Sequence, residues 1–271
     1  MKSFVPIAAM LTLGCKPPPP APTELEELCA YIFSHITDGL EEDEQSGFGN
    51  REPEAQLVEG LENLKDWLDV DLEDTLEGYT VESLSSDMIQ EFDQSGRGAD
   101  HLLGAAVATE SDFCSERLVE ALVTDDQSEI WADNYAVFER TYTSDPSCFP
   151  TKECTWLEGQ SYGESSWAGL IDIESLSNVQ FRWVETSYGW MMVQRSWLAS
   201  PADVSWDGVD VFGQYFVAVV IPDGERTIRM QSTWIDAEYG VLPVSEDFAL
   251  QQIVVSMQNT GSQLETWMEE H

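Results

Sequence analysis

The hydrophobic pattern of this chain changes near residue 100, and that change constrains the fold most. Six later runs either alternate apolar and polar side chains or are apolar throughout, as strands of a half-buried or buried sheet are. Gly189 and the Asp223–Gly224 pair separate neighbouring runs, as turns of antiparallel hairpins do. The runs cover residues 135–143, 154–162, 179–186, 190–198, 211–222 and 226–236.

Other elements flank these runs. Residues 101–109 predict a short strand, and residues 115–133 predict two short helices broken at Asp125–Asp126. After Pro243, Ser245 can cap a long final helix. Its apolar stripe is Leu250, Val254, Met257, Gly261, Leu264 and Met268.

Residues 23–98 have a helical pattern. Thr23 and Glu26 form a capping box that predicts a first helix ending at Gly39, and Pro53 opens a second helix. A charged, glycine-containing loop separates them. The apolar positions are Leu25, Leu28, Cys29, Ile32 and Ile36, then Leu57, Leu61, Leu64 and Leu68, then Leu72, Leu76, Leu84 and Met88 in shorter pieces.

The order strand, two short helices, six strands and a long final helix resembles the START-like (SRPBCC, helix-grip) superfamily. The most specific stretch, TIRMQSTWIDAEYGVLPVSEDFALQQIVVSMQNTGSQL, is similar to that family's last strand, acidic-glycine turn, hydrophobic-Pro step and terminal helix; VQRSWL is similar to an earlier strand. The resemblance implies an α+β domain over residues 99–271. In it, a curved antiparallel sheet of about six to seven strands grips the C-terminal helix, and the helical region 23–98 has no counterpart.

The same resemblance implies a cavity between the sheet and the final helix that binds lipids or other apolar molecules. The alternative that large aromatic side chains simply fill the core stays open. Arg182, Arg195 and Arg229 lie on strands and could orient a ligand head group, although we expect them to pair with cross-strand acids at the surface. The candidate lining residues are Phe181, Trp183, Trp190, Met192, Trp234, Met257 and Leu264.

The start of the chain predicts export and a lipid anchor. Residues 1–14 fit a signal peptide, being too short to span a bilayer. Cys15 follows Gly14 and resembles the acylated cysteine of the bacterial lipobox, although Thr12 stands where Leu is usual; palmitate is an expected acyl chain. Residues 15–22 then form a proline-rich spacer. Lys16 rather than Asp after the cysteine implies the outer membrane of a Gram-negative bacterium. The whole chain resembles uncharacterised acidic lipoproteins, which adds no function.

Four further cysteines support the prediction that the chain is exported. An even number on an exported chain predicts disulfides, and we expect the pairs Cys29–Cys114 and Cys148–Cys154. The net charge of −39 disfavours nucleic acid as a partner, because nucleic acid is bound by neutralising its phosphates with Lys and Arg. The expected partners are therefore the membrane and a small apolar molecule or lipid.

No motif predicts catalysis, a cofactor or a metal. GQSYG (159–163) matches a nucleophile elbow, but its only downstream histidine is His271. Residues 93–104 hint at a calcium loop, yet Arg97 and Gly104 stand at ligand positions.

We therefore expect no enzyme, but a lipid-anchored envelope protein that binds an apolar ligand. The alternatives are a lipid-anchored interaction or scaffold module with a filled core and, least favoured, a cryptic hydrolase. A continuous pocket of about 300 Å³ or more under the final helix would favour ligand binding.

Overall fold

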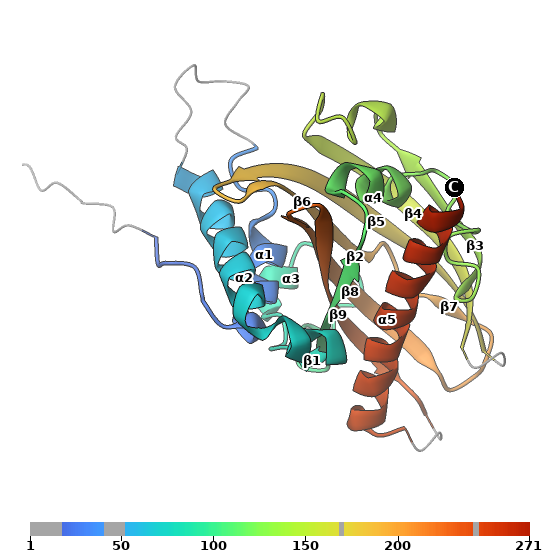
Figure 1. Ribbon diagram of the computed structural model, residues 1–271. Helices are drawn as coiled ribbons and strands as arrows, with labels where there is room; N and C mark the ends of the chain where they lie inside the picture. Colours follow the sequence, from blue (N-terminus) through green and yellow to red (C-terminus); the bar gives the residue numbers. More distant parts are fainter. Residues whose placement is uncertain (1–17, 41–51, 168–170, 241–243) are drawn as a thin grey trace, which may run out of the picture.

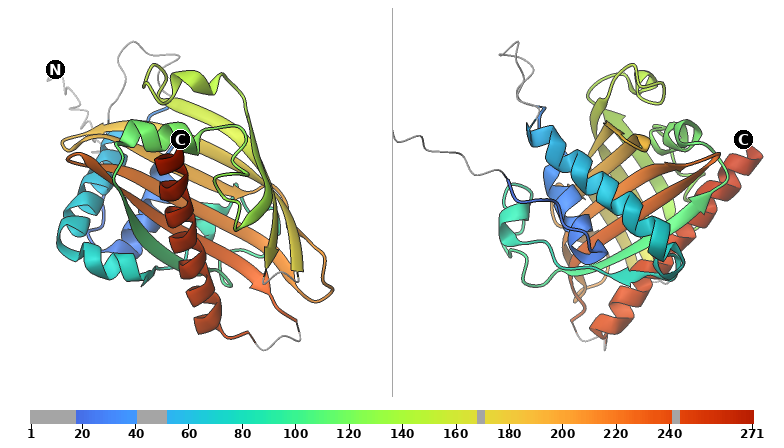
Figure 2. Two further views of the ribbon diagram at one scale, coloured as in Figure 1. Left: turned by 45° about the vertical axis from the view of Figure 1, so that its right-hand side comes forward. Right: turned by 60° about the vertical axis from the view of Figure 1, so that its left-hand side comes forward.

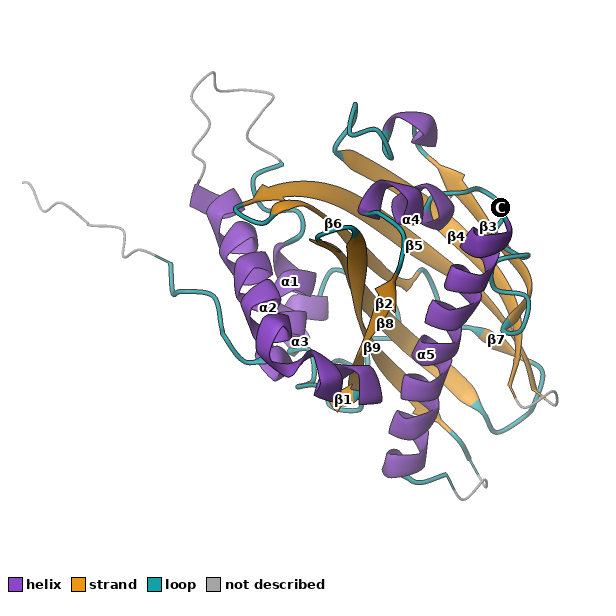
Figure 3. Ribbon diagram, in the orientation of Figure 1, coloured by secondary structure: helices purple, strands orange, loops and turns teal. Residues whose placement is uncertain are grey.

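The computed structural model describes residues 18–40, 52–167, 171–240 and 244–271, and these form three layers. Helices from the first part of the chain cover one face of a central antiparallel sheet, and the long C-terminal helix crosses the other face (Figures 1 and 3). Figure 2 shows the same separation of the two helical layers from two more directions.

The first layer holds α1 (Leu25–His35), α2 (Glu52–Glu77) and α3 (Ser86–Ile89). The helix α2 is interrupted at Asp71, whose backbone is not helical. The predicted capping box on α1 is wrong, because the residue at its N-cap is Glu24, which makes no side-chain cap. Ser85 caps α3 instead, by accepting a hydrogen bond from the Met88 amide at 3.3 Å.

The second layer is a single sheet of nine strands within the described residues, in the order β1-β2-β9-β8-β6-β5-β4-β3, with β7 paired to β5. Neighbouring strands run antiparallel. Two strands have only two residues, β1 (Tyr79–Thr80) and β7 (Asp203–Val204). The longer ones are β2 (Leu103–Ser111), β3 (Tyr135–Tyr142), β4 (Trp156–Trp167), β5 (Ile171–Thr186), β6 (Gly189–Leu198), β8 (Asp210–Asp223) and β9 (Arg226–Glu238).

The third layer holds α4 (Ser115–Leu122) and α5 (Glu246–Glu270). Ser245 caps α5 as predicted, accepting a hydrogen bond from the Phe248 amide at 3.2 Å. Gly261 lets α5 approach β2 closely, because a Cβ atom there would lie 2.5 Å from Cγ2 of Thr109. No helix in the described part of the chain is both long and apolar enough to cross a bilayer.

The predicted α+β class is confirmed, with a final helix lying across an antiparallel sheet. The six predicted runs correspond to β3, β4, β5, β6, β8 and β9. Two details differ. The strand β5 begins at Ile171 rather than at residue 179, and the second short helix predicted after α4 is a set of hydrogen-bonded turns around Trp131. The charged loop predicted between the first two helices falls almost wholly outside the described residues.

The two faces of the sheet contribute to different cores. Under α1–α3, Leu61 and Leu64 of α2 pack with Phe33 and with Trp234 of β9. Trp234 is fully buried there, and its Nε1 donates to the carbonyl oxygen of Glu82 at 2.8 Å. Under α4 and α5, a second cluster includes Phe181, Trp183, Met192 and Leu264. We call these sides the α1–α3 face and the α5 face.

The cysteines require one correction. The predicted Cys148–Cys154 disulfide is present and closes the loop around a short 3-10 helix, η1 (Pro146–Cys148). The predicted Cys29–Cys114 pair is wrong, because both residues are free thiols. Cys29 is buried in the core of the α1–α3 face, whereas Cys114 is exposed at the N-cap of α4, on the other side of the sheet.

Candidate functional site: a cavity beneath the C-terminal helix

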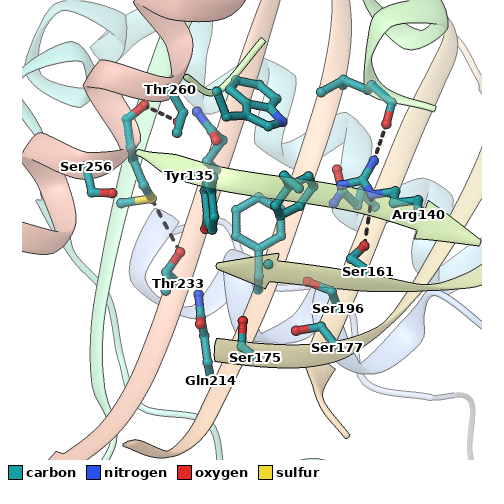
Figure 4. Close-up of a pocket in the computed structure, with 18 of the residues that line it drawn as sticks. Tyr135, Arg140, Ser161, Ser175, Ser177, Ser196, Gln214, Thr233, Ser256 and Thr260 are labelled. Atoms are coloured by element: carbon teal, nitrogen blue, oxygen red, sulfur yellow. Dashed lines mark hydrogen bonds between the residues drawn. The ribbon is translucent and has the colours of Figure 1, made fainter. Parts of the chain in front are cut away.

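A cavity of about 160 Å³ lies between the α5 face of the sheet and α5 itself (Figure 4). Leu122 at the end of α4 and Tyr135 and Phe138 of β3 close one side of it. Polar side chains line most of the rest. They are Ser161, Ser175, Ser177, Gln194, Ser196, Gln214, Gln231, Thr233, Ser256 and Thr260.

The cavity exists because residues of β4, β5, β6, β8 and β9 that face α5 are polar. On β9 the facing residues are Arg229, Gln231 and Thr233, while Met230 and Trp234 point to the α1–α3 face. Side chains of neighbouring residues in a strand point to opposite faces, so this parity holds along the strand. Serines at positions 175 and 177 of β5 occupy less volume than the aliphatic residues that would otherwise fill this space.

Hydrogen bonds fix two walls of the cavity. On the α5 side, Thr233 Oγ1 donates to Sδ of Met257 at 3.6 Å, and Thr260 Oγ1 donates to the Met257 carbonyl at 2.8 Å. On the β3 side, Arg140 Nε donates to Ser161 Oγ at 2.9 Å, and Nη1 donates to the carbonyl of Leu122. Figure 4 shows these bonds as dashed lines.

Several buried polar atoms of the lining have no hydrogen-bond partner within the described residues. They are Oε1 of Gln194, Nε2 of Gln231, and Nε and Nη1 of Arg229. The three residues are 4%, 2% and 5% exposed. An unpaired buried polar atom costs about 1–3 kcal/mol, and most buried groups in proteins avoid this cost. These four atoms belong to three residues that line one cavity.

Among the described residues, the charged members of the lining are Arg140 and Arg229. Neither takes part in an ion pair with a carboxylate in the described part of the chain. Burial, and next the positive charge of Arg140, lower the pKa of Arg229 to about 9. A chain with a net charge of −39 therefore encloses a cavity whose own charges are all positive.

Of the seven predicted ligand residues, Met257 lines this cavity. Phe181, Trp183, Met192 and Leu264 lie in the apolar core beside it, and Trp190 packs against that core, as the core-filling alternative predicts. Grouping Trp234 with them is wrong. It faces the α1–α3 layer because its position in β9 has the opposite parity to the cavity residues.

The expectation that three strand arginines pair with cross-strand acids at the surface is also wrong, since all three are buried and the ion pair of Arg182, with Glu54 at 3.4 Å, goes to α2. Arg195 Nη1 donates to the carbonyl of Phe33 at 2.9 Å, and Arg182 Nη1 donates to that of Ile36 at 2.7 Å. Both thus satisfy carbonyls at the C-terminal end of α1, which favours cations. Arg229 instead faces the cavity. The sequence indicates this orientation, because residues 229, 231 and 233 are all polar and lie on the same side of the strand.

The two sequence motifs that match a nucleophile elbow and a calcium loop form no such site in the described residues. The GQSYG stretch lies inside β4, where Ser161 Oγ accepts a hydrogen bond from Arg140 rather than facing a general base. The Asp93 carboxylate accepts bonds from the amides of Ser95, Gly96 and Gly98. Across the described ranges, no group of three or more His, Cys, Asp or Glu side chains is placed to hold a metal ion.

Comparisons with known proteins add little. No family model and no curated protein matches the chain. A STAR-related lipid transfer protein from Xanthomonas axonopodis is similar in structure, with 12% identity over 64% of this chain and 97% of that one, at a TM-score of 0.45. Human StAR-related lipid transfer protein 5 covers 82% and 99% at 11% identity and a TM-score of 0.43. A START superfamily protein from Mycobacterium smegmatis covers 62% and 97% at 10% identity and 0.39.

Proposed function

We propose that this protein is a non-catalytic binding protein of the cell envelope, which holds a small ligand between its sheet and α5. The observation that carries the proposal is the set of unpaired buried polar atoms on Gln194, Arg229 and Gln231, three residues that line one cavity. A core that only had to be stable would place apolar side chains there, because unpaired buried polar groups are destabilising. The same cavity argues against the alternative of an interaction module with a filled core.

The size and lining of the cavity revise the expected ligand. Its volume of about 160 Å³ is below the 300 Å³ expected for a carrier of lipids. It is close to the roughly 150 Å³ of an engineered cavity that binds benzene. Trp131, Tyr135, Phe138 and Phe216 offer an apolar surface next to the polar one. The ligand that fits is a small amphipathic molecule, or one such group of a larger molecule.

The anchor forms the second part of the proposal. Cys15 carries the acyl chains and holds the protein at the outer membrane, with the proline-rich segment as a spacer. Asn63 Nδ2 of α2 donates to the carbonyl of Pro22 at 2.8 Å, and Ala21 is buried, whereas Pro18, Pro19 and Pro20 are exposed. The folded part thus begins at residue 21, so the last two residues of the predicted spacer already contact the domain. The variant Cys15→Ser should move from the membrane fraction to the soluble fraction; unchanged membrane association would contradict the anchor.

Mass spectrometry tests the cavity. Under native conditions the protein purified from its own membranes should carry a small-molecule adduct that disappears on denaturation. Ser177→Phe should lose the adduct because the ring occupies the cavity. The matched control is Leu176→Phe, because Leu176 is 39% exposed and precedes Ser177 on the same strand. An adduct that survives Ser177→Phe, or a wild-type protein without one, would contradict the proposed function.

A further inference from the structure

Two buried arginines on the same sheet differ in how their donors are satisfied. Arg195, on the α1–α3 face, is 2% exposed and donates to Phe33 O at 2.9 Å and to Gln180 Oε1 at 2.6 and 3.1 Å. Arg229, on the α5 face, is 5% exposed, yet its Nε and Nη1 reach no acceptor. The fold can therefore provide acceptors for a buried guanidinium but provides none for these two atoms.

The charge of Arg229 is also unbalanced. The chain has 51 acidic residues, but none of those that the structure describes lines the cavity. Arg140 adds a second positive charge, and two of its nitrogens are occupied by Ser161 and the Leu122 carbonyl. A buried charge is strongly unfavourable unless it is paired. A bound anion would supply the negative charge that pairs with Arg229.

We propose that the ligand of this cavity is a small organic anion, a carboxylate or a phosphate monoester, bound through the guanidinium of Arg229. This inference rests on the proposed function. Arginine suits the role because its planar group matches the geometry of carboxylate and phosphate oxygens. The positive charge of Arg140 helps to position the anion. The hydrogen bonds of Arg140 hold its own side chain against β4.

The two glutamines specify the ligand further. Gln231 Nε2 has no acceptor and supplies one more donor for the anionic group. Gln194 Oε1 has no donor and accepts a hydrogen bond from a hydroxyl or amine of the ligand. Trp131, Tyr135 and Phe138 contact its apolar part, since they line the same small cavity.

Calorimetric titration with matched probes tests the anion. Benzoate and phenyl phosphate are the anionic probes, and benzamide and benzyl alcohol are neutral molecules of similar shape. The wild-type protein should bind the anions about tenfold or more tightly than the neutral probes, the scale of one charge-assisted hydrogen bond. Arg229→Met should remove this preference, and Arg229→Lys should keep part of it, because the ammonium retains the charge but not the planar geometry.

Arg226→Met is the matched control. Arg226 is the first residue of the same strand, but its side chain is 52% exposed, so the variant loses the same charge outside the cavity. It should bind the anions like the wild type. Arg229→Met should melt at or above the wild-type temperature without ligand, which shows that it folds.

The outcomes separate the two proposals. Equal binding of neutral and anionic probes, or unchanged anion binding by Arg229→Met, would overturn the anionic ligand while leaving a binding cavity. The absence of binding by every probe, together with no adduct on the purified protein, would overturn both.

Discussion

The two faces of one sheet are completed in different ways. On the α1–α3 face, strand residues meet apolar helix side chains, and the guanidinium groups of Arg182 and Arg195 meet carbonyls of α1 and its following turn. On the α5 face, the strands present serine, glutamine and Arg229 to a cavity, with polar atoms left unpaired. Unpaired buried polar atoms occur on both faces, with Ser232 Oγ on the first, but those of Gln194, Arg229 and Gln231 belong to residues that line a cavity on the second. Under the proposed function, this contrast separates residues that stabilise the fold from residues that bind the ligand.

The largest expected effect on the free energy of unfolding comes from a substitution on the α1–α3 face. Trp234→Ala should reduce the free energy of unfolding by about 3–5 kcal/mol, because it empties a fully buried site and leaves the Glu82 carbonyl without its donor. Urea denaturation measures the loss. Anion binding by the folded variant should be unchanged, since Trp234 lies across the sheet from the cavity. Loss of binding in a folded Trp234→Ala protein would mean that the two faces are not separate.

The next effect compares one substitution on both faces. Arg195→Met should destabilise the protein by about 3 kcal/mol, because it removes charge-assisted hydrogen bonds to Phe33 O and Gln180 Oε1. Arg229→Met should be neutral or stabilising by about 1 kcal/mol, because it removes a buried charge without partners. Urea midpoints at constant slope measure both. Equal destabilisation by the two variants would remove the distinction between the faces.

The cysteines test the same geometry chemically. In a protein with Cys15→Ser, one thiol should react rapidly in the native state, that of exposed Cys114, and a second, that of Cys29, should react on unfolding. Burial raises the pKa of Cys29 to about 12, which suppresses its thiolate. Replacing Cys148 and Cys154 with serine should cost about 2 kcal/mol, as expected for a short closed loop. Finding no free thiol after unfolding would restore the Cys29–Cys114 pair.

The smallest effect depends on pH. Burial and then the charge of Arg140 lower the pKa of Arg229 to about 9 in the folded protein, below its value in the unfolded chain. Below pH 9 both states hold the proton, so the full cost of burying the charge is present. Above pH 9 the unfolded chain binds more protons than the folded protein does, and the wild type gains stability relative to Arg229→Met.

The stability difference between these two proteins should therefore narrow by about 1 kcal/mol between pH 8 and pH 10. Urea midpoints of the wild type and Arg229→Met at each pH measure it. Arg226→Met is the control, because its exposed side chain should give a constant difference. A difference that stays constant between pH 8 and pH 10 would show that Arg229 keeps its proton in the folded protein, and would contradict the lowered pKa.

The sequence allowed most of the element order to be predicted, because alternating runs such as 179–186 indicate strands. The cap at Ser245 was predictable because a serine just before a helical pattern is a typical N-cap. The start of β5 was missed because Ser175 and Ser177 occupy facing positions that are apolar in an ordinary strand. The placement of Trp234 was missed for another reason. Both faces of β9 are buried. Alternation alone therefore does not say which set of alternate residues faces α1–α3 and which faces α5.

The most direct measurement is a crystal structure of the protein with 4-bromobenzoate, whose bromine is located by its anomalous signal. We predict one strong peak inside the cavity, with the bromine against Tyr135 or Phe138 and the carboxylate on the Arg229 guanidinium. A cavity that contains only ordered water at saturating 4-bromobenzoate, or a carboxylate turned away from Arg229, would contradict this account.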